Sequence, residues 1–394
     1  MGESAALETS EVLEYMSTCR EYVLCELRTI VSRDREGHGL YDLMLDYPLR
    51  EAKALRPALC IATCRAHGGQ LESVLKSAAV IELYHNAFLI HDDVEDGSER
   101  RRDEPTLHAR HGVPIAINVG DAMLALALEP LLANMRQIGM GKALRILQAV
   151  ATMARETAEG QAMELGWIAG GVFDLRDRDY LRMVHKKTSW YTFLTPVVLG
   201  GMVAGCDDRR LYELRRFATA LGTAFQIQDD ILNLTADPRQ YGKEIEGDLW
   251  EGKHTLILTH AVRHADPADR RRAVEILSKP RPTLPGGEPD RLARARALVE
   301  ELAARAELGP DVKRRFDDVL GTERADARFR TREDVEFLSE LVRRNGSIGY
   351  ARRVAERRAR RAVRALDGVA AALPDSEHLR FLRGLAEFVV ARDH

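Results

Sequence analysis

The stretch LESVLKSAAVIELYHNAFLIHDDVED, residues 71–96, decides the fold that the sequence predicts. Its apolar residues recur at intervals of three and four up to residue 90, the spacing of a helix that buries one face. The alternation typical of strands is scarce elsewhere, and glycine pairs such as Gly68-Gly69 separate further helical stretches. Besides residues 71–90, we expect helices over residues 10–31, 122–138, 143–159 and 180–193.

The composition excludes several classes of protein. The 394 residues carry 58 Lys and Arg against 61 Asp and Glu, a net charge of −3, which argues against a basic nucleic-acid-binding protein. A hydrophobic fraction of 45% argues against a largely disordered chain. Aromatic residues make up 6%, fewer than an all-β sandwich or barrel is expected to use. We therefore predict a single all-α domain that spans residues 1–394.

No targeting or membrane segment is expected. The first residues, MGESAALETSEVLEYM, lack the basic start and apolar core of a secretory signal. The most apolar stretch, 113–132, carries Asn118, Asp121 and Glu129, so we expect no run of the ~18 apolar residues that a membrane span needs. The five cysteines lack the spacing of a zinc site and are interpreted as reduced thiols of a cytoplasmic protein.

Two aspartate pairs follow apolar helical stretches. The first stands in HNAFLIHDDVED, residues 85–96, and the second in FQIQDDILN, residues 225–233. At about 100° per residue, Asp96 lies about 40° around the helix from Asp92, and His85 lies within about 20° of it. Asp229 and Asn233 share a helix stripe in the same way.

The aspartate stripes and their basic neighbours point to a metal and a phosphate. Carboxylates on one stripe repel each other, and Mg²⁺, which prefers one or two carboxylates together with substrate phosphates, is the simplest compensation. Either cluster alone could be a solvated helix end. Cations suited to phosphate stand nearby: Lys53, Arg56, Arg100, Arg101, Arg102, Lys187, Lys243 and Lys253. Neither a GxxxxGK[ST] loop nor a GxGxxG motif is present, so a nucleotide-binding fold is not indicated.

Several motifs occur together and in order over residues 49–258: HDDVED with RRDEPTLH, GDAML, KKTSWY, FQIQDDILN and GKEIEGDLWEGKHT. In this combination the chain resembles the trans-isoprenyl diphosphate synthase (polyprenyl synthetase) family, and among its members the short-chain geranylgeranyl and farnesyl diphosphate synthases. The resemblance implies an all-α isoprenoid-synthase bundle of helices around a central cavity, usually a homodimer. It also implies a Mg²⁺-dependent prenyltransferase that joins isopentenyl diphosphate to an allylic diphosphate.

The resemblance also implies a role for each matching residue. The Mg²⁺ ligands match Asp92, Asp96 and Asp229, with Asp93 and Asp230 beside them. The isopentenyl diphosphate contacts match Lys53, Arg56, His85 and Arg102. The allylic diphosphate contacts match Arg101, Lys187, Thr188, Gln226, Lys243 and Lys253. The residues expected to act in catalysis are the five aspartates together with Arg101, Lys187, Lys243 and Lys253.

The chain departs from the family pattern at several positions. Glu51 and Ala52 replace two Gly of the first basic motif, and Ala54 replaces an Arg. Asp103 replaces a Gly after the arginines. Asn233 replaces the last Asp of the second aspartate motif, and its carbonyl oxygen can still serve as a metal ligand.

Two regions near the C-terminus have no role in the resemblance. Segment 267–332 is longer than the family leads us to expect, and it contains a Pro- and Gly-rich loop at 279–290, KPRPTLPGGEPD. From residue 343 onward arginine pairs accumulate, which we interpret as a solvated helix face.

Residues that precede Asp92 on its helix predict the length of the product. Phe88 lies one turn before Asp92 and Tyr84 one turn further, with Ile81 almost in line and the small Ala87 beside Phe88. One aromatic side chain with a second behind it favours geranylgeranyl diphosphate, followed by farnesyl diphosphate.

Other functions remain open at this point. They are a longer-chain product, a terpene cyclase on the same fold, a non-catalytic regulatory subunit and a phosphohydrolase of the HD type. The phosphohydrolase needs His91 as a metal ligand beside Asp92, and it leaves the second aspartate pair without a role.

Overall fold

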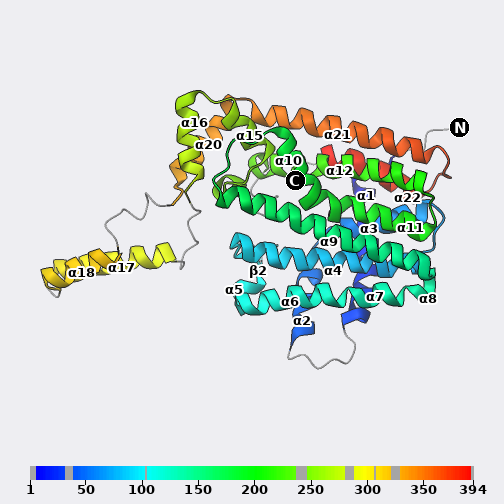
Figure 1. Ribbon diagram of the computed structural model, residues 1–394, viewed down its shortest axis with the longest axis horizontal. Helices are drawn as coiled ribbons and strands as arrows, with labels where there is room; N and C mark the ends of the chain where they lie inside the picture. Colours follow the sequence, from blue (N-terminus) through cyan, green and yellow to red (C-terminus); the bar gives the residue numbers. More distant parts are fainter. Residues whose placement is uncertain are drawn as a thin grey trace.

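The structure is a computed structural model that describes residues 6–31, 39–102, 104–236, 246–279, 288–305, 308–320 and 329–391. Among these residues the elements are helical, except for one short antiparallel hairpin (Figure 1). The hairpin pairs β1 (Arg100–Arg101) with β2 (Glu104–Pro105). The expected all-α fold class is therefore confirmed.

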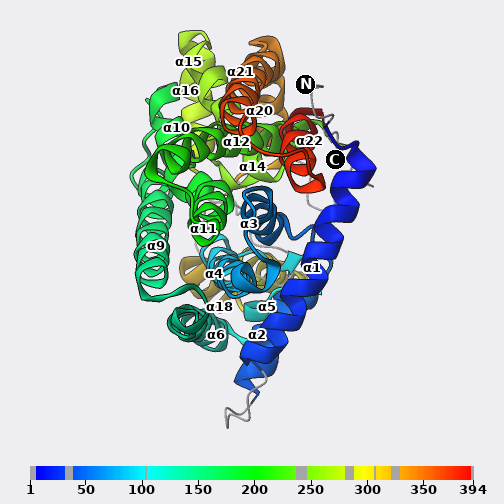
Figure 2. The ribbon, with the colours of Figure 1, turned by 90° about the vertical axis from the view of Figure 1, so that its right-hand side faces the viewer.

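The helix quoted first, α4 (Leu71–Asp96), lies at the centre of the N-terminal half. Most of its residues up to Ile90 are buried, because it packs against α3 (Leu55–Ala66), α1 (Thr9–Val31) and α6 (Val113–Leu126). Figure 2 shows α1 crossing one side of the bundle toward α2 (Leu40–Leu49). Helix α4 continues through the whole first aspartate motif, six residues beyond the predicted helix.

The predicted helix over 122–138 is wrong in its bounds. After α5 (Leu107–His111), α6 ends at Leu126 and is followed by α7 (Leu128–Ala133) and α8 (Met135–Ile138), in one line along an edge of the bundle (Figure 1). The interruption has a local cause, because Pro130 has no N–H to donate to the carbonyl of Leu126.

The same line of helices corrects the expectation about apolar runs. Residues 113–138 contain an 18-residue window with a mean hydropathy of 1.6, long and apolar enough to cross a membrane by length and composition. Of that window, 44% is buried inside the structure, where α6 packs on α4. A partly buried core helix passes the same test, so the window alone is weak support for a membrane span.

Two close helix contacts shape the middle of the chain. Helix α9 (Met140–Ala169) runs beside a π-helix, η1 (His185–Leu194), that continues α10 (Asp177–Val184), so the predicted helix at 180–193 changes its winding midway. The contact requires Gly160, since a Cβ there would lie 2.2 Å from the backbone nitrogen of Lys187. Helix α11 (Thr195–Ala204) approaches α3 as closely, at Gly200.

The C-terminal half is built on α12 (Asp208–Thr235), which packs along α21 (Ser347–Ala370). Figure 1 shows the last helix, α22 (Glu377–Ala391), beside α12, with α15 (Leu256–Arg263) and α20 (Arg332–Arg344) near the other end of α21. The short helix α14 (Gly247–Glu251) packs on α12 and α20. These last elements form a second apolar cluster around Leu256 and Leu338. The aspartate-bearing end of α12 packs Ile227 and Ile231 into this second cluster, and that of α4 packs Val94 against the first.

The extended segment 267–332 contributes three described helices. Helix α16 (Pro267–Leu277) packs on α15 and α20, while α17 (Glu288–Ala304) and α18 (Pro310–Leu320) pack on each other. Figure 1 shows the α17–α18 pair standing out from the bundle. Of the predicted loop at 279–290, residues 280–287 lie outside the described residues, and a helix already begins at Glu288.

Candidate active site

The first aspartate motif occupies the last turns of α4. Asp92 and Asp96 are one helical turn apart, and their side chains are 27% and 16% exposed. The side chain of Asp93 is fully buried. Gly97 ends the helix in the left-handed conformation, with φ at 63°. Two carboxylates therefore lie at the open side of the helix, and the third faces the protein interior.

Buried Asp93 is held by two side chains from elsewhere in the chain. Arg101 donates from Nε to Asp93 Oδ2 at 2.9 Å and from Nη2 to Asp93 Oδ1 at 2.6 Å, which makes a bidentate ion pair. The hydroxyl of Tyr47 donates to its Oδ2 at 2.5 Å. Arg101 also lies 3.8 Å from Asp92 Oδ2. Asp93 thus anchors Arg101 at the edge of the site, and its oxygens face away from the exposed stripe.

Two lysines lie against the exposed stripe. Nζ of Lys187 is 3.4 Å from Asp92 Oδ1, and Nζ of Lys253 is 3.5 Å from Asp96 Oδ2. Burial opposes the charge of Asp92, but Lys187 and Lys253 lower its pKa below the usual range. Burial raises the pKa of Asp96 to about 7, and the charge of Asp92 adds to the rise. The stripe is therefore short of positive charge at Asp96, where a further cation would be stabilised.

The second aspartate motif stands at the end of α12. Asp229 is half-buried, and Asp230 is buried. The hydroxyl of Tyr180 donates to Asp230 Oδ2 at 2.7 Å, and the amide of Gln226 donates to its Oδ1 at 2.8 Å. Burial raises the pKa of Asp230 well above its usual range, and the nearby charge of Asp248 adds to the rise. Neutral donors therefore hold this carboxyl group, and Gln226 is engaged with it.

Asn233 is occupied by the backbone. Its Oδ1 accepts the N–H of Asp248 at 3.1 Å, and its main-chain carbonyl accepts the N–H of Glu246 at 2.9 Å. The amide oxygen that we considered as a metal ligand therefore positions the start of α14.

A basic cavity of about 140 Å³ lies between α3, α4 and α22. It is lined by all four residues predicted to contact isopentenyl diphosphate, namely Lys53, Arg56, His85 and Arg102. His85 Nδ1 and Arg56 Nε are buried and have no hydrogen-bond partner among the described residues. Burial lowers the pKa of His85 well below its usual range, and the Arg56 charge lowers it further, so its ring is neutral. Unpaired donors in a basic cavity fit an anion that accepts several hydrogen bonds.

Aromatic side chains stand on α4 before the aspartates. The ring of Phe88 is 5.9 Å from that of Tyr84 and 5.6 Å from that of Tyr191 on η1, edge to face in the latter pair. Ile81 and Ala87 are buried. Phe88 and Tyr191 are only partly buried, so these two rings are the accessible part of the group.

Some of the residues singled out in the sequence lie outside the described part of the chain, or make no side-chain contact that defines their role. Lys243 and Asp103 lie outside the described residues. Thr188 is half-buried on η1 beside Lys187. Within the described part of the chain, no three His, Cys, Asp or Glu side chains are grouped closely enough to hold a metal ion by themselves.

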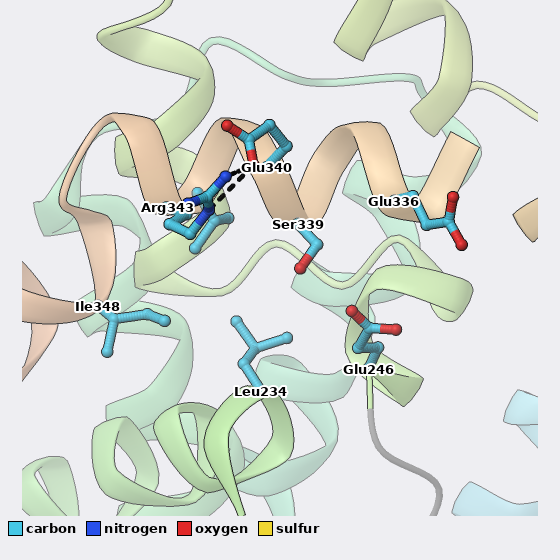
Figure 3. A pocket seen from close by; sticks show the side chains of 8 residues that line it. Leu234, Glu246, Glu336, Ser339, Glu340, Arg343 and Ile348 are labelled. Atoms are coloured by element: carbon cyan, nitrogen blue, oxygen red, sulfur yellow. Dashed lines mark hydrogen bonds and ion pairs between the residues drawn. The ribbon is translucent and has the colours of Figure 1, made fainter. Parts of the chain in front are cut away.

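A larger cavity, of about 310 Å³, lies beyond the end of α12. Figure 3 shows Glu340 beside Arg343 on α20, with Ser339, Leu234 and Glu246 around the same space. Glu340 pairs with Arg343, and Glu246 pairs with Arg332 at 3.0 Å. Because these acids are paired and none belongs to the aspartate motifs, we do not place the substrate here.

A family model for polyprenyl synthetases matches residues 38–284, more than half of the chain. The chain belongs to the polyprenyl synthetase family. The short chain isoprenyl diphosphate synthase of Methanocaldococcus jannaschii is 35% identical over 252 residues, 64% of this chain and 74% of that relative. The octaprenyl diphosphate synthase of Escherichia coli is 29% identical over 86% of both chains. The structure of geranylgeranyl pyrophosphate synthetase from Pyrococcus horikoshii matches with a TM-score of 0.75 at 28% identity, over 96% of this chain and 98% of that one.

As a polyprenyl synthetase, the protein is a trans-prenyltransferase that makes prenyl diphosphates. The phosphohydrolase alternative does not fit this family, and His91 does not lie on the aspartate stripe. Its Nε2 is 3.5 Å from Asp121 Oδ1 on α6. The relatives include both short-chain and octaprenyl synthases, so similarity alone does not assign the product length.

Sequence reasoning missed two polar residues of this polyprenyl synthetase site. On α9, Glu164 pairs with Lys187, and Gln161 Nε2 lies 3.5 Å from Asp92 Oδ1. The predicted helix ended at residue 159, whereas α9 runs to Ala169 and carries both side chains to the aspartates. Continuing the predicted helix by two turns beyond residue 159 would have found them. Tyr47 and Tyr191 gave no such signal, because their partners are distant in the sequence.

Proposed function

We propose that this prenyl diphosphate synthase condenses isopentenyl diphosphate with an allylic diphosphate to give geranylgeranyl diphosphate. The observation that carries the proposal is the presence of two different anion sites around one hairpin. Asp92, Asp96 and their lysines suit a diphosphate that arrives with a metal, while the 140 Å³ cavity, whose lining has three basic side chains against one carboxylate, Glu82, suits one held without a metal. Arg101 belongs to the first site and Arg102 to the second.

Magnesium fits the carboxylates of the first site. Asp92 and Asp96 from α4 and Asp229 from α12 would hold it, and they are too few to form an all-protein cage. Mg²⁺ usually binds one or two carboxylates and completes its shell with water and substrate phosphates. When bound, it supplies positive charge that stabilises the departing diphosphate.

The chain's own cations then act on each diphosphate. Lys187 and Lys253 lie within 3.5 Å of the metal-binding carboxylates and can donate to the allylic diphosphate as it leaves. We assign Thr188, Gln226 and Lys243 to the same group. In the basic cavity, neutral His85 donates a hydrogen bond while the other three residues supply positive charge. The new carbon–carbon bond forms at the allylic carbon, and the proton that is lost passes to the released diphosphate.

The product length follows from the accessible aromatic rings. Phe88 and Tyr191 meet edge to face, with Tyr84 behind Phe88. A growing chain directed back along α4 meets Phe88 first, which favours a twenty-carbon product over a longer one. Phe88→Ala, or the double variant with Tyr84→Ala, should lengthen the product by at least one five-carbon unit. Unchanged length in the double variant would place the floor of the cavity elsewhere.

We also propose a cytoplasmic homodimer. Val113, Ile117, Leu128 and Leu132 are each more than 40% exposed and recur along α6 and α7. Exposed apolar stripes of this kind typically mark protein interfaces, and a second copy of the chain is the simplest occupant. Light scattering at micromolar concentration should give the mass of two chains, and Ile117→Glu with Leu128→Glu should give that of one.

One assay tests the whole proposal. Purified protein is incubated with Mg²⁺, isopentenyl diphosphate and either dimethylallyl, geranyl or farnesyl diphosphate, and the dephosphorylated products are separated by chromatography. We expect a twenty-carbon alcohol as the longest major product. A fifteen-carbon or longer limit would correct the chain length, and no condensation with any substrate would contradict the proposed function.

A further inference from the structure

Tyr47 lies on α2, outside the aspartate motifs, yet its hydroxyl reaches the first of them. The side chain is 1% exposed. The hydroxyl donates to Asp93 Oδ2 at 2.5 Å and accepts the backbone N–H of Leu107 at 3.3 Å. Burial raises the pKa of Tyr47 above its usual range, and the Asp93 charge raises it further, so the group remains a donor. Both hydrogen-bonding capacities of this buried phenol are therefore used.

Asp93 transmits this constraint to Arg101. Its Oδ1 accepts from Arg101 Nε and Nη2 at 2.8 and 2.6 Å, and its Oδ2 accepts from Arg101 Nε at 2.9 Å. With Tyr47 on the other side, the carboxylate has one orientation. A fixed carboxylate fixes the plane of the guanidinium group, since a bidentate pair is planar. No hydrogen bond from Arg101 Nη1 is found among the described residues, so this nitrogen remains for a ligand.

The same end of α2 also holds the hairpin backbone. Arg50 Nη1 donates to the carbonyl of Arg101 at 2.9 Å, and its Nη2 donates to that of Pro105 at 2.8 Å. The Arg50 guanidinium lies 4.4 Å above the Tyr47 ring. The Tyr47 carbonyl accepts from Arg102 Nη1 at 3.1 Å. Tyr47 therefore contacts Arg102 through its backbone carbonyl, and its hydroxyl reaches Arg101 by way of Asp93.

We propose that Tyr47 is a positioning residue that sets the direction of Arg101 toward the allylic diphosphate, acting through Asp93. The inference rests on the proposed function, because it takes the allylic diphosphate as the ligand of Arg101. It predicts that loss of the Tyr47 hydroxyl affects the allylic diphosphate and leaves the binding of isopentenyl diphosphate unchanged. Removing the hydroxyl loosens Arg101, whereas the backbone contact to Arg102 and the basic cavity stay intact.

The test is Tyr47→Phe, which keeps the ring beneath Arg50 and removes only the hydroxyl. The KM for farnesyl diphosphate should rise about tenfold, the scale of one lost hydrogen bond to a charged group. The KM for isopentenyl diphosphate should stay within about twofold of that of the unchanged protein. A merely structural role would instead lower the thermal midpoint and leave both KM values unchanged.

A matched control is Tyr350→Phe. The hydroxyl of Tyr350 donates to Asp177 in the same kind of pair, on α21 and away from both anion sites. It should change neither KM. If Tyr47→Phe is insoluble, Asp93→Asn carries the same test, because it keeps an acceptor for Tyr47 while removing the charge that holds Arg101. Equal rises in both KM values, or no rise in either, would overturn the inference.

Binding of inorganic diphosphate with Mg²⁺, measured by calorimetry, separates this inference from the proposed function. Tyr47→Phe should weaken that binding about tenfold whether or not condensation occurs. If the unchanged protein binds diphosphate but condenses nothing, the proposed function fails while the role of Tyr47 is still measured. If the protein condenses normally and the variant binds as tightly, the role of Tyr47 fails alone.

Discussion

The two aspartate motifs contain the same pair of letters, but their buried members are held by different chemistry. Asp93 receives a bidentate arginine and a tyrosine hydroxyl. Asp230 receives a tyrosine hydroxyl and a neutral amide. The buried aspartate of the first motif is therefore paired with a cation, while that of the second lies beside further acids, among them Asp248, that raise the pKa of Asp230. The difference indicates that the second motif depends more on charge brought by the ligand.

Both motifs nevertheless share one architectural solution. In each, the second aspartate faces inward to a buried tyrosine, Tyr47 on α2 or Tyr180 on α10, and the first aspartate remains partly accessible. An inward carboxylate fixes the end of its helix, and the outward one stays partly accessible to a ligand. In each pair, therefore, the second aspartate anchors the helix end and the first is available to bind the ligand.

The largest expected effect comes from the outward aspartates. Asp92→Ala or Asp229→Ala should lower turnover by about a thousandfold or more, because the charge on the leaving diphosphate loses its counter-ion. Helical content by circular dichroism should not change. Asp121→Ala is the control, since that carboxylate is 65% exposed on α6. Near-normal activity of Asp229→Ala would show that the second motif binds no metal. The two motifs could then no longer be treated as two parts of one metal site.

The next effect distinguishes the inward aspartates. Tyr180→Phe removes a hydrogen bond that favours the charged form of Asp230, so the already raised pKa of this carboxyl group should rise further. We expect about tenfold lower turnover at pH 7, with partial recovery as the pH is raised and the charged form of Asp230 gains population. Tyr47→Phe should show no such recovery, because the bidentate pair between Arg101 and Asp93 does not depend on the tyrosine hydroxyl. Identical pH profiles for the two variants would contradict the difference between the motifs.

A smaller effect is expected on the pH dependence of the stability of the metal-free protein. The pKa of Asp96 is about 7 in the folded protein against 3.8 as its reference, so the folded state binds the proton more tightly. Such a group costs stability as pH rises from about 4 to about 7. Metal-free Asp96→Asn should therefore gain stability relative to the unchanged protein over that window, measured as the urea midpoint. A difference that is constant with pH would show that Asp96 titrates normally.

The sequence predicted the parts of this site that depend on local geometry. The stripe of Asp92 and Asp96 follows from 3.6 residues per turn, and α4 extends far enough to carry it. The contacts of Asp93 could not be predicted, because Tyr47 is 46 residues away and is brought to it by the packing of α2. Glu164 was missed for a different reason, since the predicted helix ended at residue 159 whereas α9 continues to Ala169. Asn233 shows that a matching position does not guarantee a matching role, since its oxygen is used by the backbone.

The smallest effect concerns backbone strain, which both sides of the site share. Among the described residues, the non-glycine residues with positive φ are Ala54, Arg102 and Glu246, at 47°, 54° and 62°, and all three lie within the predicted phosphate-handling motifs. A left-handed conformation costs a residue with a Cβ about 1 kcal/mol, part of which glycine returns as entropy of the unfolded chain. Ala54→Gly should therefore raise the free energy of unfolding by about 0.5 kcal/mol, measured in urea.

The matched control is Ala52→Gly, two residues earlier and without a positive φ, which should lower the free energy of unfolding by up to about 1 kcal/mol. Glu246→Gly makes the same test beside the second motif. It also loses the ion pair to Arg332, whose side chain is 60% exposed, so that loss is worth little. If Ala54→Gly and Glu246→Gly both stabilise the protein, the two sides store strain alike and differ only in charge. If only one of them does, backbone strain is present on that side of the site alone. The two sides then differ in backbone strain as well as in charge.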